Sequence, residues 1–255
     1  MSHRDTPWPA GTPCWVDIAV PDLAVATAFY GAVLGWTFVD SGAEFGHYTI
    51  ARTDGRAAAA IGPIMQEGTP TVWTVYLASE DADATAELIT ENGGTLLFEP
   101  MEIPGNGRMT VAVDPDGGAF GVWQAIGMNG FGIANEPGSV VWTDARLTDV
   151  AAGKAFYSAV FGYTYQPVPG APDDYGTVHA GGDPVGGMGG MMAGPPGAPA
   201  HWLTYFAVTD VDAAVAAAGQ GGGRVVMPLE DTPFGRMGIL ADPFGASFVV
   251  IQMPG

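Results

Sequence analysis

Short runs of alternating apolar and polar residues follow one another along the chain, separated by segments with helical spacing. Residues 15–20 alternate and are rich in β-branched side chains, which is typical of a half-buried strand. Asp22 then stands at the position of a helix N-cap, and apolar residues recur at helical spacing until Gly35 ends the pattern. The pattern next predicts three short strands, at 36–40, 48–52 and 57–61.

The same succession starts again with a strand at 73–78 and a helix at 81–91, and it ends with a strand at 120–124. One strand, one helix and three strands therefore form a unit that occurs twice in the first half of the chain. The second half repeats the first, because residues 28–36 return as 155–163 with six of nine positions identical at an offset of 127. We predict an α+β fold of four βαβββ modules, with a first domain at 1–126, a linker at 127–138 and a second domain at 139–255.

Two motifs occur once in each half. The helix carries Phe-Tyr, at 29–30 and 156–157, and a late turn carries Asp-Pro-x-Gly, at 114–117 and 242–245. With the βαβββ order, these motifs resemble the vicinal-oxygen-chelate superfamily, which includes glyoxalase I, extradiol dioxygenases and bleomycin-resistance proteins. The resemblance implies tandem glyoxalase-like domains with two concave mixed sheets. The two-domain layout is also similar to actinomycete proteins labelled glyoxalase-like or hydroxylase, some of which belong to aromatic-polyketide clusters.

The resemblance implies where a metal would be held, since metal-using members place ligands on the first, fifth and eighth strands of a domain. Those positions are occupied here by Trp15, Thr74 and Gly121 in the first copy and by Trp142, Leu203 and Val249 in the second. None of the six is a usual ligand for a divalent metal. We therefore predict no catalytic metal and no cofactor, with a displaced set of Asp144, His201 and Glu230 as the alternative.

Strand alternation predicts which side chains line the concave faces. They are Trp15, Asp17 and Tyr76 in the first copy and Trp142, Asp144, Arg146, His201 and Tyr205 in the second. An aromatic floor with a few polar groups is typical of a small-molecule pocket. We predict that Asp144 and His201 are catalytic and move a proton, and that the other six bind substrate. The alternatives are that the tryptophans only fill the cavity and that Asp144 only pairs with Arg146.

A glycine-rich segment at 181–197 contains a run of methionines between 188 and 192. No helix start follows it, so no dinucleotide site is implied. Methionines on a flexible backbone adapt to irregular apolar ligands, and we predict that Met188 and Met191 bind substrate. The alternative is an ordinary strand whose methionines fill the core.

Charge and composition limit the classes of molecule that the protein is expected to bind. Lys and Arg number 8 against 27 Asp and Glu, so the formal charge is −19, which repels nucleic acids and attracts cations. The single cysteine, Cys14, excludes an intrachain disulfide and is predicted to be a buried thiol. The sequence has neither a secretion signal nor an apolar run of about 18 residues, so we expect a cytoplasmic protein without a membrane partner.

These observations favour a metal-independent enzyme of secondary metabolism. It would act on an aromatic or polyketide-like small molecule in a cyclisation, an isomerisation or a step that assists hydroxylation. The alternative is a protein that binds and sequesters an aromatic or cationic drug without chemistry, for which cation–π capture and the acidic field are suited. A metal-dependent glyoxalase or dioxygenase is the least favoured hypothesis. No motif indicates a protein partner.

Overall fold

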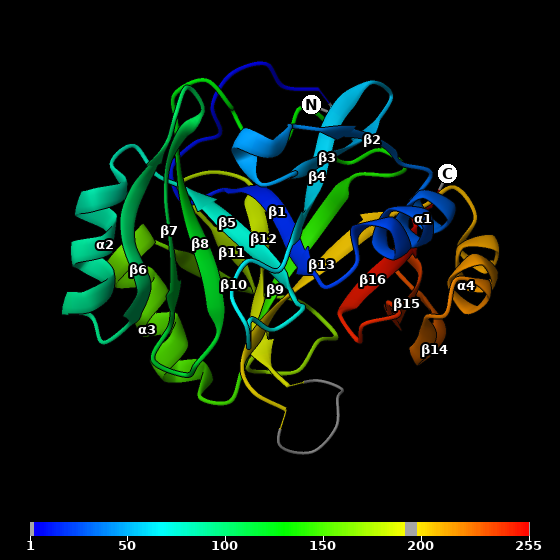
Figure 1. Ribbon diagram of the computed structural model, residues 1–255. Coiled ribbons are helices and arrows are strands. Elements are labelled where there is room, and N and C mark those ends of the chain that lie inside the picture. Colours follow the sequence, from blue (N-terminus) through cyan, green and yellow to red (C-terminus); the bar gives the residue numbers. More distant parts are fainter. Residues whose placement is uncertain (1–2, 192–197, 255) are drawn as a thin grey trace.

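Four βαβββ modules assemble into two eight-stranded mixed sheets, as the sequence predicts (Figure 1). The computed structural model describes residues 3–191 and 198–254. Within these ranges, no helix is both long and apolar enough to cross a membrane.

The first sheet has the strand order β2-β3-β4-β1-β5-β8-β7-β6, in which β1 pairs parallel with β4 and antiparallel with β5. Its elements are β1 (Pro13–Val20), α1 (Leu23–Leu34), β2 (Thr37–Asp40), the 3₁₀ turn η1 (Ala43–Phe45), β3 (Thr49–Thr53), β4 (Arg56–Pro63), β5 (Trp73–Ala78), α2 (Ala82–Glu91), β6 (Thr95–Ile103), β7 (Gly107–Val113) and β8 (Ala119–Ala125).

The second sheet repeats this topology in the order β10-β11-β12-β9-β13-β16-β15-β14. Its elements are β9 (Val140–Leu147), α3 (Val150–Phe161), β10 (Thr164–Pro167), β11 (Gly176–His179), β12 (Pro184–Gly190), β13 (His201–Ala207), α4 (Val211–Gln220), β14 (Arg224–Thr232), β15 (Gly235–Ala241) and β16 (Ser247–Gln252).

The helix boundaries follow from capping residues that the sequence reveals. The Asp22 side chain accepts the backbone N–H of Val25 at 3.0 Å at the start of α1, and Gly35 ends the helix in the left-handed conformation. Asp149 and Gly162 do the same for α3. The predicted start and stop of the first helix are thereby confirmed.

The two domains are held together by an exchange of polar contacts between their modules. The indole of Trp73 donates to the Tyr30 hydroxyl at 3.1 Å, and this hydroxyl donates at 3.0 Å to Asp242, in the second domain. An equivalent series of hydrogen bonds joins the corresponding residues of the second repeat. It runs from Trp202 to the Tyr157 hydroxyl at 2.9 Å and from there to Asp114 in the first domain at 3.0 Å.

The helices also pack across the domain interface. Helix α1 lies against α4 of the other domain, and α2 lies against α3, so each end of the molecule combines both halves of the chain (Figure 1). Phe248 packs on Tyr30 with ring centroids 5.5 Å apart, and Phe120 packs on Tyr157 at the same distance. The faces of the sheets that point away from these helices are the concave faces discussed below.

Replacing Tyr30 or Tyr157 with Phe should weaken both domains at once. Each variant removes a hydroxyl that satisfies a buried carboxylate across the domain interface, and we expect a loss of about 1–2 kcal/mol in the free energy of unfolding. Tyr165→Phe is the matched control, since the Tyr165 hydroxyl donates to Lys154 O within its own domain. Denaturant titration measures the difference, and equal losses in all three variants would contradict the proposed role of the exchange.

Candidate functional site

Asp144 lies at the centre of a closed polar cluster on the concave face of the second domain. Trp142 Nε1 and the Tyr175 hydroxyl donate to its Oδ1 at 2.9 and 3.0 Å. The Tyr205 hydroxyl donates to Oδ2 at 2.6 Å, and the Arg146 guanidinium pairs with the same oxygen. Asp144 is only 1% exposed, so four donors from the protein occupy the carboxylate.

Arg146 is buried and completes this cluster. Burial opposes its charge, but Asp144 and Tyr205 outweigh that effect and raise the pKa of the guanidinium. The guanidinium lies 5.5 Å from the ring centroid of Tyr175 and donates to the Tyr205 hydroxyl at 3.1 Å. Among the described residues, its Nη1 atom has no hydrogen-bond partner. The ion pair that the sequence left as an alternative for Asp144 and Arg146 is present.

This geometry argues against the prediction that Asp144 moves a proton, whereas the same role for His201 stays a prediction. Asp144 is saturated by four donors and shielded from solvent, which leaves no free oxygen for a substrate. His201 lies opposite Arg146 on the neighbouring strand, and its Nδ1 atom is 2.9 Å from Pro199 O. No hydrogen bond joins His201 to Asp144 in the described part of the chain.

The glycines of β12 have a steric role that the sequence did not reveal. Gly187 pairs with Asp144, and a Cβ there would overlap both Asp144 Oδ1 and the Tyr175 hydroxyl. At Gly189 a Cβ would come within 2.9 Å of the Tyr175 side chain. The glycines therefore make room for Tyr175 to cross β12 and reach the carboxylate.

The prediction that Met188 binds substrate is wrong. Met188 alternates with the glycines, so its side chain points to the opposite face and is 0% exposed within the core. Met191 follows the end of β12 and is partly exposed. Met192, from the same predicted segment, lies outside the described residues.

The first domain contains a related cluster around Asp17. The Tyr48 and Tyr76 hydroxyls both donate to Asp17 Oδ2, at 2.9 and 3.1 Å, and Trp15 Nε1 donates to the Tyr48 hydroxyl at 2.9 Å. In the described part of the chain, no donor reaches Oδ1. The structure thus brings together Trp15, Asp17 and Tyr76 as the strand alternation implies, and it adds Tyr48.

Tyr48 and Tyr175 are the residues that sequence reasoning missed. Each directly precedes the third strand of its domain, in a loop where alternation gives no information. A signal was nevertheless present, because 175 − 48 = 127, which is the offset of the repeated helix. Identical tyrosines at the repeat offset indicate a shared role, and here both bind the central aspartate.

The two clusters differ in charge. The position of Arg146 is occupied by Ala19 in the first domain, and among the described residues no cation lies beside Asp17. Burial raises the pKa of the Asp17 carboxyl to about 6, because the hydrogen bonds from Tyr48 and Tyr76 offset only part of the desolvation. Asp17 is also only partly buried, unlike Asp144. It therefore offers a carboxylate that can exchange a proton near neutral pH.

A cavity of about 370 Å³ lies on the same face of the first domain, further along the sheet, and its lining shares no residue with the Asp17 cluster. Ala78 lies in its floor, two residues along β5 from Tyr76, and Trp8 and Trp123 contribute aromatic walls. Its volume is within the range of small-molecule sites. The Asp17 cluster and this cavity together form the candidate site.

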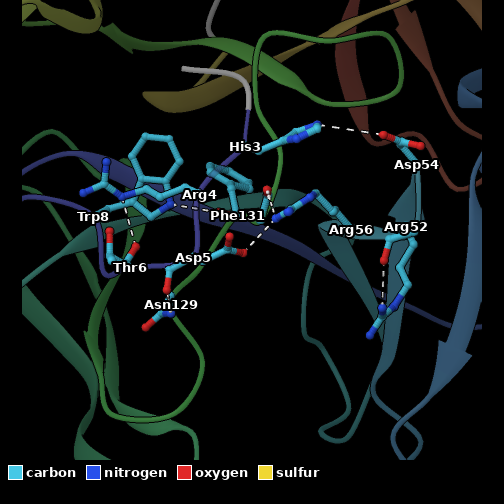
Figure 2. A network of polar contacts seen from close by, with 12 residues as sticks. His3, Arg4, Asp5, Thr6, Trp8, Arg52, Asp54, Arg56, Asn129 and Phe131 are labelled. Carbon is cyan, nitrogen blue, oxygen red and sulfur yellow. Dashed lines mark hydrogen bonds and ion pairs between the residues drawn. The ribbon is translucent and has the colours of Figure 1, made fainter.

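The N-terminal segment covers this cavity and is fixed in place by polar contacts (Figure 2). Trp8 Nε1 donates to Phe131 O at 3.1 Å, and Arg56 pairs with Asp5 at 2.8 Å. The Phe131 ring lies 6.0 Å from Trp8 and 5.7 Å from Trp15 between ring centroids. Aromatic side chains therefore lead from the cavity roof to the Asp17 cluster.

The residues at the ligand positions that the resemblance implies do not fit a divalent metal. The indole nitrogens of Trp15 and Trp142 donate hydrogen bonds and cannot ligate. Leu203 and Val249 are apolar, and a side chain at Gly121 would overlap the Tyr76 ring. Within residues 3–191 and 198–254 no three His, Cys, Asp or Glu side chains lie close enough to hold a metal ion, including the alternative set with Glu230.

Comparison with known proteins identifies the family. The model of the glyoxalase/bleomycin resistance protein/dioxygenase superfamily matches residues 14–122 and 139–250. The chain belongs to this superfamily. It is 37% identical over 249 residues to the protein CFP32 of Mycobacterium tuberculosis (strain CDC 1551 / Oshkosh), covering 95% of both chains. It is 38% identical over 268 residues to the anthracycline biosynthesis protein DnrV of Streptomyces peucetius, covering 95% of this chain and 94% of DnrV.

Solved structures of this superfamily share the fold. The Mn(II)-bound glyoxalase from Novosphingobium aromaticivorans superposes with a TM-score of 0.66 at 15% identity and covers 99% of this chain and 85% of its own. The 2,2',3-trihydroxybiphenyl 1,2-dioxygenase of Sphingomonas wittichii strain RW1 gives 0.63 at 15% identity, with 97% and 93% covered. At this identity the likeness extends to the fold and not to the chemistry.

Replacement by asparagine at Asp17 and at Asp144 should change the free energy of unfolding in opposite directions. In Asp17→Asn the amide oxygen still accepts from Tyr48 and Tyr76, but a negative charge without a counter-ion is removed. We therefore expect the free energy of unfolding to rise by about 1–2 kcal/mol at pH 7. Asp144→Asn leaves the Arg146 guanidinium buried without its partner, and we expect a loss of about 3–5 kcal/mol.

The pH dependence of stability independently tests whether Asp17→Asn raises or lowers the free energy of unfolding. Because the pKa of Asp17 is about 6 in the folded protein and about 3.9 in an unfolded chain, ionisation of Asp17 lowers the free energy of unfolding as pH rises from about 4 to 6. The advantage of Asp17→Asn should therefore vanish near pH 4. Denaturant titrations at pH 4 and 7 measure it, and a loss of stability in Asp17→Asn at pH 7 would contradict the account.

Gly187→Ala should disrupt the second cluster, since its Cβ overlaps Asp144 and Tyr175. We expect a loss of about 1–3 kcal/mol in the free energy of unfolding. Gly182→Ala is the control, because nothing lies within 4 Å of a Cβ at that position. If thermal unfolding shows the two variants to be equally stable, the close approach of Tyr175 does not constrain this strand.

Proposed function

We propose that this protein binds an aromatic, polyketide-like small molecule on the concave face of its first domain and transfers a proton with Asp17. The observation that carries the proposal is the Asp17 carboxylate, which keeps one oxygen without a donor among the described residues and lies on the same sheet face as an aromatic-walled cavity. The role lies in secondary metabolism and does not use a metal. The relative DnrV, named for anthracycline biosynthesis, supports the substrate class and the metabolic context.

The residues around Asp17 have separate tasks in this proposal. Tyr48 and Tyr76 hold Oδ2, and their pKa values are raised well above the ordinary range, chiefly by burial, so both hydroxyls stay protonated as donors. This arrangement leaves Oδ1 as the atom that accepts the proton. A carboxyl with a pKa near 6 is mostly ionised at neutral pH, and its pKa is close enough to that pH for it to accept a proton and return it. Trp8 and Trp123 would bind the flat rings by stacking.

Turnover by protein treated with a chelator tests the proposal. The protein is incubated with aromatic polyketides of three and four fused rings, and products are separated and identified by mass spectrometry. We expect the rate to survive removal of metal, to rise with pH through about 6 and to fall about 100-fold in Asp17→Asn.

Glu44→Gln is the matched control, because it removes one exposed carboxylate from the same domain and should leave the rate unchanged. Turnover that Asp17→Asn does not slow would refute the role of Asp17. Tight binding without any product would instead favour the sequestering protein that the sequence left as the alternative.

A further inference from the structure

The two concave faces differ by one cation. Asp17 and Asp144, and Tyr48 and Tyr175, stand at the repeat offset of 127, as do Trp15 and Trp142. At the same offset Arg146 has Ala19 as its counterpart. The second domain thus contains a complete carboxylate–guanidinium pair, and the first contains the carboxylate and its tyrosines alone.

Because Ala19 stands where the second domain has an arginine, one carboxylate oxygen of Asp17 lacks a partner among the described residues. Both donors of Asp17 bind Oδ2, whereas Asp144 has donors on both oxygens and a guanidinium in addition. A partly buried carboxylate without a counter-ion is costly, and a cation that reached it would be held more strongly than at the surface. In the part of the chain that the structure describes, Oδ1 of Asp17 is therefore an acceptor without a donor that a cation could bind.

The place of the missing side chain is partly exposed to solvent. Ala19 is partly exposed and pairs with Gly62 in β4, over which the Tyr48 ring packs. Val72 directly precedes β5 beside it and is 45% exposed, and Met65 follows β4 and is 77% exposed. Exposed apolar side chains on the segments that flank this position suit a ligand whose cationic group is attached to an apolar body.

The Arg146 guanidinium of the second domain shows how a cationic group binds at this position. There the guanidinium lies against the carboxylate and 5.5 Å from the ring of Tyr175. Tyr48, the counterpart of Tyr175, offers the same ring beside Asp17 for a cation–π contact. The net charge of −19 raises the local concentration of cations around the whole molecule.

We propose that the first domain binds an organic cation, an ammonium or amidinium group on an apolar body, at Asp17 Oδ1, where it replaces the guanidinium that Arg146 supplies in the second domain. This inference rests on the small-molecule site proposed above and adds a positive charge to its ligand. The cation and the aspartate form a charge-assisted hydrogen bond, and no covalent step is involved.

Calorimetric titration with a pair of probes tests it on the whole protein. 2-Naphthylmethylamine carries the cation, and 2-naphthylmethanol has the same rings with a neutral hydroxyl. At pH 7.5 we expect the amine to bind at least tenfold more tightly than the alcohol. At pH 5 the preference should shrink about tenfold as Asp17 becomes protonated, since the only other titratable groups on it among the described residues are the Tyr48 and Tyr76 hydroxyls, which stay protonated.

Three variants distinguish binding at Asp17 from attraction by the negative charge of the whole protein. Asp17→Asn should bind amine and alcohol equally, whereas Glu44→Gln should keep the preference because it removes a carboxylate outside the site. Ala19→Arg should supply the guanidinium from within, abolish amine binding and raise the thermal unfolding temperature, which also demonstrates that this variant folds.

The outcomes distinguish this inference from the proposed function. Equal binding of amine and alcohol to the wild-type protein, or no binding of either up to 10 mM, overturns the cation site. A preference for the amine that survives Asp17→Asn overturns it as well. Turnover of uncharged polyketides would remain possible in each case, and a selective amine site without turnover would instead refute the catalytic proposal alone.

Discussion

The structure depends on one reciprocal contact, in which a tyrosine of each domain donates to a buried aspartate of the other. Tyr30 reaches Asp242 and Tyr157 reaches Asp114, and a tryptophan donates to each tyrosine in turn. Burial raises the pKa of both carboxyls, so the hydroxyls and the backbone N–H groups of the turn are needed to satisfy them. The Phe-Tyr and Asp-Pro-x-Gly motifs are thus two halves of one interface, which explains why both occur in each repeat.

This cross-docking keeps the two sheets alike while their concave faces differ. The second face is closed by an ion pair between Asp144 and Arg146 that three aromatic side chains contact. The first face retains the aspartate, has Ala19 in place of the arginine and lies beside a cavity. A duplicated scaffold of this kind can stabilise itself with one copy of a cluster and leave the other copy for a ligand.

The sequence predicted the fold well because its signals are local or periodic. Capping by Asp22 and Gly35, strand alternation and the offset of 127 need no knowledge of distant contacts. The site was harder, because its chemistry depends on what surrounds each carboxylate. Alternation placed Asp144 on the correct face but could not show that Tyr175 and Tyr205 saturate it. Met188 was assigned to the ligand since glycines on both sides conceal the pattern of a strand, and only the packing reveals its face.

The unequal cost of the two aspartates connects stability to function. Asp144 is neutralised within the fold, so its charge needs no ligand, whereas the charge on Asp17 destabilises the free protein at neutral pH. An asparagine would preserve the hydrogen bonds of Tyr48 and Tyr76 without that penalty. A group that lowers stability in this way is typical of a functional site, where local structure departs from what folding alone favours. The energy that the uncompensated carboxylate costs the free protein is recovered when a cation or a proton arrives, and it therefore adds to the affinity for either one.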